Sequence, residues 1–231
     1  MSLCLDSDMV YLIGAILGDC YLSNSHKSKK DFSKDYRIAI EMTDIDYLHR
    51  EVFPIVKNLT SSTSIPKNRK RKNKKESSYL IVRNKRLHNF LTKNIGIPSG
   101  KKSGTIFVPQ QIQEALQPIK RDFLAGVFDT DGGFRGKSLG FTTKSKVFRD
   151  GLYLLLEEFE IKCYKEEWLN KKYNKNYFGL NISKSDIVRF LNEIPIRNHE
   201  KLKRINERFG LHVGVPERSN GLESFSNREL S

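Results

Sequence analysis

Two aspartates, Asp19 and Asp131, each end a short apolar segment of the same unusual composition. Residues 12–20 read LIGAILGDC, and residues 124–132 read LAGVFDTDG. Both segments have glycine at the third position, a small residue at the seventh and aspartate at the eighth. An acid at the end of a buried helix is costly unless its charge is used, so the pair predicts one shared site.

Two carboxylates at helix C-termini repel each other and the negative end of the helix dipole, and the resulting field attracts divalent cations. Magnesium in proteins is held by a few carboxylates together with phosphate oxygens of the substrate. The pair therefore predicts a two-metal site for phosphodiester hydrolysis, in which the metals activate a water and stabilise the leaving oxygen. The competing interpretation is two buried helices with incidental acids, which is disfavoured because aspartate is unfavourable at a helix C-terminus.

Small residues on one face of each segment predict close packing of two helices. Gly14 and Gly18 are four residues apart, and so are Gly126 and Thr130. Small residues at this spacing let two helix backbones approach each other closely. We therefore expect these four residues at a helix interface, with the two acids meeting at its end.

The charge of the chain favours a polyanionic partner. Its 231 residues include 41 lysines and arginines against 27 aspartates and glutamates, which gives a net charge of +14, typical of nucleic-acid-binding proteins. Residues 67–75 contain seven cations and no acid, and such a run repels itself unless a polyanion lies nearby. No apolar run approaches the roughly 18 residues that span a bilayer, and a secretory signal is lacking. Three scattered cysteines indicate an intracellular, reducing compartment, either the cytoplasm or an organelle.

The order of elements repeats along the chain. The two acidic segments lie 112 residues apart, and a strand-helix pair recurs with an offset of 100 residues, from Phe90 to Phe190. Strands are expected over residues 35–42, 62–66, 77–82, 138–143, 161–168 and 176–182. Helices are expected over residues 8–20, 43–58, 85–94, 119–131, 145–159, 184–193 and 198–208. With one further short strand after each acid, each half reads α-β-β-α-β-β-α, which predicts an α+β fold.

These elements predict a first half over residues 1–95, a linker over 96–118 and a second half over 119–209. Residues 210–231 are expected to form a loosely packed or disordered tail. A polar segment at residues 23–34 accounts for the extra length of the first half. The prolines and glycines of the linker predict a tether more than a structured element. Its residues 96–103 look like a phosphate-binding loop, but their glycine spacing excludes one.

Residues 10–20 and 122–132 resemble the two motifs of a LAGLIDADG homing endonuclease in its single-chain form. The order of elements fits over residues 8–195. The resemblance implies two motif helices side by side at the centre of a pseudo-twofold molecule, with a curved antiparallel sheet from each half facing DNA. It implies a monomeric, Mg²⁺-dependent endonuclease of intron homing that cuts both strands of a long, pseudo-symmetric DNA site. Mn²⁺ or Ca²⁺ is expected to substitute for Mg²⁺ in the site.

The resemblance also implies roles for individual residues. Asp19 and Asp131 would be catalytic metal ligands, with Gly18 and Thr130 beside them as further ligands. Two departures from the family pattern, Cys20 for the usual glycine and Leu17 for a frequent acid, leave both catalytic acids in place.

A basic or amide residue from the following strand stands near each metal-bound water in the family. Lys144 fits this role in the second half, with Arg135 as the second choice, and an ordinary surface lysine is the alternative interpretation of Lys144. The corresponding strand end of the first half, at residues 41–43, has no lysine or glutamine.

Contacts with DNA are expected from the solvent-facing sides of the strands. Arginine and lysine suit guanine edges and asparagine suits adenine, although many such groups bind only phosphates, which position a protein without selecting a sequence. The candidates are Arg37, Glu41, Lys67, Arg69, Lys70, Arg71, Arg83, Arg135, Ser138, Thr142, Lys171, Lys172, Lys175 and Asn181. For each of them the alternative is a solvated surface group.

The alternative function is a non-cleaving nucleic-acid binder on the same fold, such as an intron RNA maturase or a transcription regulator. Intact acids in both motifs favour the enzyme, because a binder has no need for them. A protein that only binds RNA is disfavoured, since the stacking aromatics of RNA-recognition sheets are not evident in the sequence.

Overall fold

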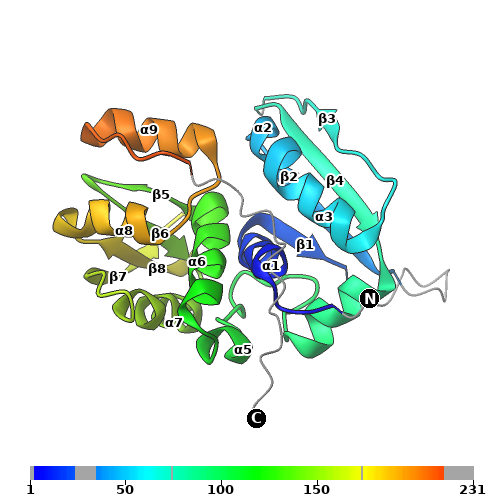
Figure 1. Ribbon diagram of the computed structural model, residues 1–231, viewed down its shortest axis with the longest axis horizontal. Coiled ribbons are helices and arrows are strands. Elements are labelled where there is room, and N and C mark those ends of the chain that lie inside the picture. The colour runs from blue at the N-terminus through cyan, green and yellow to red at the C-terminus, as the bar shows by residue number, and fades with distance from the viewer. Residues whose placement is uncertain (1–2, 24–34, 74, 173, 216–231) are drawn as a thin grey trace, which may run out of the picture.

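The computed structural model describes residues 3–23, 35–73, 75–172 and 174–215, with the backbone alone for Asp19. Most of the polar segment expected at residues 23–34 and the tail from residue 216 onward therefore lie outside the described residues. Within the described ranges, the chain forms two α-β-β-α-β-β-α halves on either side of a central pair of helices (Figure 1). This confirms the predicted α+β fold.

The first half forms a four-stranded antiparallel sheet in the order β1-β2-β4-β3. Its strands are β1 (Cys20–Leu22), β2 (Arg37–Met42), β3 (Lys67–Arg69) and β4 (Ser77–Arg83). Its helical segments are α1 (Ser7–Asp19), then α2 (Ile45–Tyr47), η1 (Leu48–Val52) and α3 (Phe53–Thr60) in direct succession, and then α4 (Lys85–Asn89) with η2 (Phe90–Asn94).

The strand predicted at residues 62–66 is wrong, because β3 begins only after Pro66. Lys67 pairs with Tyr79 and Arg69 pairs with Ser77, so the strand uses the first residues of the basic run. Proline has no N–H to donate to a strand ladder, and the pairing starts just beyond it.

The second half repeats this arrangement with a sheet in the order β5-β6-β8-β7. Its strands are β5 (Gly132–Arg135), β6 (Ser138–Thr143), β7 (Cys163–Asn170) and β8 (Lys175–Ile182). Its helical segments are α6 (Gln117–Asp131), α7 (Lys146–Glu157), η3 (Lys184–Asp186), α8 (Ile187–Glu193) and α9 (His199–Phe209), whereas α5 (Gln110–Gln113) lies before them, between the halves.

Short polar side chains begin several of these helices. The carboxylate of Asp6 accepts from the backbone N–H of Met9 at 2.8 Å at the start of α1, and Asn198 accepts from that of Lys201 at 2.9 Å at the start of α9. Such caps satisfy backbone donors that have no partner within the helix. They set where α1 and α9 start, and so where the residues further along these helices point.

Each sheet has one buried face and one outer face. In the first sheet, alternate residues such as Ile38, Ile40 and Leu80 are buried in the core. In the second sheet, Phe141 and Leu180 are buried in the same way, and α7 packs against both of their strands, β6 and β8. The residues between them on each strand therefore point to the opposite side, which is the outer face of that sheet.

The segment between the halves is more than a tether. It contains α5, and its residues Ile97, Ile106, Val108 and Ile112 are all buried in the core. These apolar residues are spaced irregularly among glycines and prolines, so no helical or strand period marks them in the sequence. Among the described residues, no helix is long and apolar enough to cross a membrane.

Candidate active site at the ends of the two central helices

The two central helices, α1 and α6, pack side by side with their backbones in contact (Figure 1). A Cβ atom built on Gly14 would lie 2.3 Å from the carbonyl oxygen of Phe123, and one built on Gly126 would lie 2.1 Å from that of Tyr11. No side chain tolerates such distances, so only glycine permits this approach. Gly14 and Gly126 of the predicted helix interface thus lie where the helices touch.

This packing brings the C-terminal ends of the two helices together. Asp19 is the last residue of α1 and Asp131 is the last residue of α6. A Cβ atom on Gly18 would lie 2.3 Å from the hydroxyl oxygen of Thr130 and 3.3 Å from the carboxyl carbon of Asp131. The carboxyl group of Asp131 therefore lies against the end of α1, beside the residue that precedes Asp19.

Two lysines that were not predicted from the sequence hold these helix ends. The Nζ of Lys102 donates to the carbonyl oxygens of Leu17 at 2.6 Å and Gly18 at 2.7 Å. Lys102 is buried, with 8% of its surface exposed. The last carbonyls of a helix lack partners within the helix and carry the negative end of its dipole, so this ammonium group satisfies and neutralises them.

Lys201 does the same for α6. Its Nζ donates to the carbonyl oxygens of Phe128 at 2.6 Å, Asp129 at 2.9 Å and Gly132 at 2.7 Å. A positive charge therefore stands at the end of each motif helix, next to the residue predicted as a metal ligand.

The sequence contains a signal that would have identified this pair of lysines. The pattern Ile95-Gly-Ile97 recurs as Ile194-Pro-Ile196, an offset of 99 residues, and Lys102 and Lys201 are also 99 residues apart. The repeat therefore extends beyond the last helix of each half, into the segments expected to be a linker and an additional helix.

The residue after each acid has ordinary backbone geometry. Cys20 has φ −97° and ψ 162°, and Gly132 has φ −76° and ψ 157°. Any residue adopts these angles, so Cys20 costs no backbone strain at this position. Its side chain is buried, with Sγ 3.5 Å from the carbonyl oxygen of Ala15.

Asp129, two residues before Asp131, is a structural acid. It is buried and accepts hydrogen bonds from the hydroxyl of Tyr11 at 2.7 Å and from the backbone N–H of Arg197 at 2.8 Å. Burial raises its pKa to about 6, against the opposing effect of Lys201 and the hydroxyl of Tyr11. Asp129 thus joins both motif helices to the segment that leads into α9.

Lys144, predicted to support the attacking water, directly follows β6. Its Nζ lies 5.3 Å from the centroid of the Tyr177 ring, on the outer face of the second sheet. Arg135, the second choice, also lies on this face and bonds Thr142, Asn181 and Glu166. The catalytic role of either residue stays a prediction.

On the outer face of the first sheet, Glu41 holds two arginines. Its carboxylate accepts from Arg69, from Arg71 at 2.9 Å and from the hydroxyl of Ser77 at 2.8 Å. Burial acts to raise the pKa of Glu41, but the Ser77 hydrogen bond and the two guanidinium groups outweigh it and keep the pKa below its ordinary value. Glu41 therefore stays ionised and fixes cations on the surface predicted to face DNA.

The other predicted DNA contacts are distributed over the strands and hairpin tips. Arg37 pairs with Arg83 across β2 and β4. Ser138 donates to the carbonyl oxygen of Ile182. Lys67 lies on β3, Lys175 begins β8, Lys70 follows β3, and Lys171 and Lys172 follow β7.

Aromatic residues do occur on the outer face of the second sheet, contrary to expectation. The rings of Trp168 and Tyr177 stack with centroids 5.9 Å apart and planes at 18°. They pair across β7 and β8, which places them together although they are nine residues apart in the sequence.

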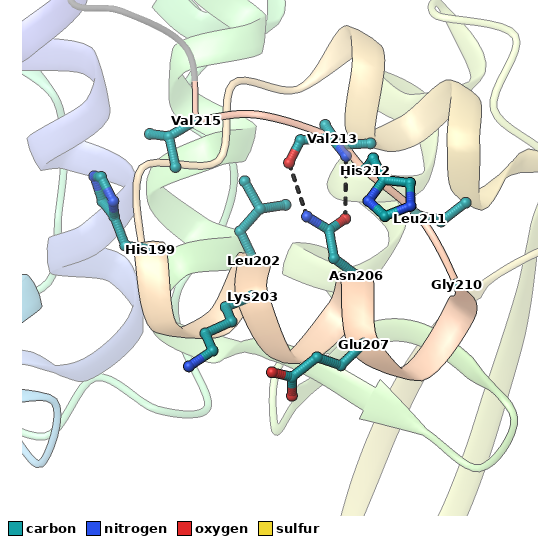
Figure 2. A pocket seen from close by; sticks show the side chains of 10 residues that line it. All are labelled: His199, Leu202, Lys203, Asn206, Glu207, Gly210, Leu211, His212, Val213 and Val215. Atoms are coloured by element: carbon teal, nitrogen blue, oxygen red, sulfur yellow. Dashed lines mark hydrogen bonds between the residues drawn. The ribbon is translucent and has the colours of Figure 1, made fainter.

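A cavity of about 460 Å³ lies elsewhere, between α9 and residues 210–215 (Figure 2). The side-chain amide of Asn206 holds this segment, donating to the carbonyl oxygen of Val213 at 2.8 Å and accepting from its N–H at 3.3 Å. None of the predicted site residues lines this cavity. The candidate site is thus the surface around the two helix ends and not an enclosed pocket.

Comparison with known families matches residues 118–195 to the LAGLIDADG-like domain. This range contains α6 with Asp131 and runs to just beyond α8. The matched range includes the second acidic motif.

Solved structures share the fold of most of the chain. I-DmoI bound to DNA and Ca has a TM-score of 0.62 at 18% identity, covering 84% of this chain and 92% of its own. Other structures of I-DmoI with DNA were determined with Mn or Mg. The homing endonuclease I-WcaI bound to its DNA recognition sequence has a TM-score of 0.59 at 21% identity, covering 92% and 90%. Full-length DUF199/WhiA has a TM-score of 0.54 at 15% identity, covering 91% of this chain and 62% of its own.

Curated relatives come from Methanocaldococcus jannaschii. The chain is 35% identical to the replication factor C small subunit over 109 residues, which are 47% of this chain and 6% of that protein. It is 36% identical to the probable translation initiation factor IF-2 over 127 residues, which are 52% of this chain and 11% of that protein. The chain thus spans only a small part of the length of these relatives.

Proposed function

Residues 118–195 belong to the LAGLIDADG-like domain family within a chain of the two-motif fold, and from this premise we propose that the protein is a metal-dependent endonuclease that cuts both strands of DNA at a specific site. The observation that carries the proposal is the meeting of the two motif helices. The carboxyl of Asp131 lies against the end of α1, whose last residue is Asp19.

The groups at this position suit a hard divalent cation such as Mg²⁺. Their residue types supply oxygen donors, because Asp19 and Asp131 carry carboxylates and directly follow Gly18 and Thr130, and magnesium prefers such ligands together with phosphate oxygens. When bound there, the metal would supply Lewis-acid activation of a water and charge stabilisation at the leaving oxygen. Mn²⁺ and Ca²⁺ take similar ligands and are expected to occupy the same site.

The residues of the chain itself contribute electrostatics and position. Lys102 and Lys201 place an ammonium group at the end of each motif helix, where the two acids lie in the sequence. The same fixed charges would stabilise the negative charge that develops on a phosphate during its cleavage. The outer faces of the two sheets, in a chain whose net charge is +14, are suited to hold a DNA duplex on either side of these acids.

The test is cleavage by acid variants. The full chain is incubated with a library of randomised duplexes and Mg²⁺, and the cut ends are sequenced. Asp19→Asn and Asp131→Asn should each abolish double-strand cleavage and leave DNA affinity within a small factor, because each removes one carboxylate and little volume. Asp46→Asn, on the exposed side of α2, should cut like the wild type. Full cleavage by either motif variant would refute the two-acid site.

The second candidate is a sequence-specific binder that does not cut. It is favoured by the shared fold of DUF199/WhiA. It predicts a preferred duplex that remains intact in Mg²⁺ and in Mn²⁺, with affinity unchanged in both motif variants.

A further inference from the structure

The guanidinium group of Arg135 is held in place by three hydrogen bonds on the outer face of the second sheet. Its Nε donates to the side-chain oxygen of Asn181 at 2.8 Å, one Nη donates to the hydroxyl of Thr142, and the other donates to Glu166 at 2.7 Å. These partners come from β8, β6 and β7, so each of the other three strands of the sheet holds this side chain of β5.

Two further residues border the guanidinium group, Trp168 and Gly179. The guanidinium carbon lies 4.8 Å from the centroid of the Trp168 ring. A Cβ atom built on Gly179 would lie 2.6 Å from an Nη of Arg135 and 3.1 Å from the Trp168 ring. Gly179 has no positive φ that would require glycine. The absence of a side chain at this position therefore makes room for the arginine.

The guanidinium group of Arg135, although held in place, keeps N–H donors that could recognise a base. A guanidinium has five N–H groups, and three are used by Asn181, Thr142 and Glu166. One N–H remains on each Nη for a further acceptor. Two N–H groups on neighbouring nitrogens match the O6 and N7 acceptors of guanine in the major groove, and 20% of the Arg135 side chain is exposed to reach them.

We propose that Arg135 reads one guanine in the half of the DNA site that the second sheet contacts, and that Gly179 and Glu166 position it for that task. The inference rests on the proposed function, in that the ligand is duplex DNA. Holding the guanidinium in advance removes the rotamer entropy that a free arginine would lose on binding. It also makes the contact selective for a base edge over the many phosphates nearby.

The position of this guanine follows from the strand. Arg135 is four residues beyond Asp131 along β5, which is about 13 Å at roughly 3.3 Å per residue. At about 3.4 Å per base pair, the guanine should lie within roughly three to five base pairs of the cleaved bond.

The experiment selects preferred duplexes from a randomised library with the full chain in Ca²⁺ and sequences the bound fraction. The wild type should require guanine at one position in one half-site. Arg135→Lys and Gly179→Ala should each reduce that preference by about tenfold or more and leave the other positions unchanged. Glu166→Ala should weaken the same position, and Glu166→Gln, which keeps an acceptor, should weaken it less.

Gly179→Ala is informative because the atoms it meets are the ends of side chains, which can move without unfolding the sheet. Gly133→Ala is the matched control, since a Cβ atom on that glycine of β5 meets nothing within 4 Å. It should retain the guanine preference. If Gly179→Ala lowers the melting temperature, Arg135→Lys still tests the contact without altering the backbone.

The outcomes separate this inference from the proposed function. A preferred site whose guanine depends on Arg135, in a protein that cuts no duplex in Mg²⁺, would support base recognition by Arg135 and refute the proposed endonuclease activity. If the preference at every position survives both Arg135→Lys and Gly179→Ala, base recognition by Arg135 is refuted and the proposed endonuclease activity is unaffected. Equal loss at all positions would also refute base recognition, because it would make Arg135 a phosphate or structural contact.

Discussion

Lys102 and Lys201 make the same contact in the two halves of the molecule, each donating from its Nζ to the last carbonyl oxygens of a motif helix. They come from different kinds of segment, since Lys102 precedes α5 and Lys201 lies on α9. The pseudo-twofold arrangement thus extends to the charges around the candidate active site, and each acid has a lysine at the end of its own helix.

The first prediction concerns these lysines. Lys102→Met or Lys201→Met should slow cleavage by about tenfold to a thousandfold, because a preorganised charge at the ends of the motif helices is lost. DNA affinity should change little. The rate is measured under single-turnover conditions on a duplex that the wild type cuts, with affinity measured in Ca²⁺.

The neighbouring exposed lysines serve as controls. Lys101→Met and Lys203→Met remove the same charge from the surface and should leave the cleavage rate near that of the wild type. Lys102→Met and Lys201→Met also remove the hydrogen bonds to the helix carbonyls and should therefore lower the free energy of unfolding by about 1–3 kcal/mol. A variant that loses stability and keeps its full cleavage rate would make the lysines structural only.

The second prediction concerns the helix contact. Gly14→Ala or Gly126→Ala places a Cβ atom against backbone oxygen of the facing helix, and neither helix can move away without opening the core. We expect a loss of about 3 kcal/mol or more in the free energy of unfolding, at the upper end of overpacking effects. Gly104→Ala, where a Cβ atom meets nothing within 4 Å, should be close to neutral in the same denaturant titration.

The third prediction concerns pH and Asp129. Burial raises its pKa from the ordinary 3.8 to about 6, so the folded state binds this proton more tightly than the unfolded chain does. The associated stability is complete below about pH 4 and is lost as pH rises through about 6. A shift of this size corresponds to roughly 3 kcal/mol.

Asp129→Asn should remove this dependence. The free energy of unfolding of the variant, relative to the wild type, should rise by about 2–3 kcal/mol between pH 4 and pH 7. Denaturant titrations at several pH values measure it. A difference that is constant over this range would show that the carboxyl titrates at the same pH in the folded and unfolded states.

The fourth prediction concerns the basic run of the first half. Arg69 and Arg71 are held by Glu41, whereas Lys70, Lys72 and Lys75 are exposed and are the residues suited to bind phosphates. Replacing these three lysines with serine should flatten the slope of log affinity against log salt by about two to three units. The preferred cut site should stay the same.

Lys57, Lys85 and Lys93 provide a control with the same change in charge, on helices that cover the opposite face of the first sheet. Their replacement with serine should alter the slope much less. An equal effect of both triple variants would mean that only net charge matters. A changed cut site would instead make the basic run a reader of bases.

The local pattern of residues was sufficient to predict the architecture. Small residues four apart with an acid at the end predicted α1 and α6, alternation predicted β2, and the repeated order of elements predicted β6. The repeat then predicted two halves of the same order. These features follow from periods of 3.6 and 2 residues along the chain, which sequence alone displays.

Only the tertiary structure decided which of many similar residues serve the site. The chain has 41 lysines and arginines, and only the 99-residue offset that Lys102 and Lys201 share with the Ile95–Ile97 and Ile194–Ile196 repeat distinguishes them from the others. Their selection depends on segments that fold back onto helix ends some 70 to 85 residues away. The same holds for Arg135, whose position depends on Gly179 and Glu166 from two other strands. Spacing along the chain determines elements, whereas burial, hydrogen-bond geometry and charge neutralisation between distant segments determine what those elements hold in place.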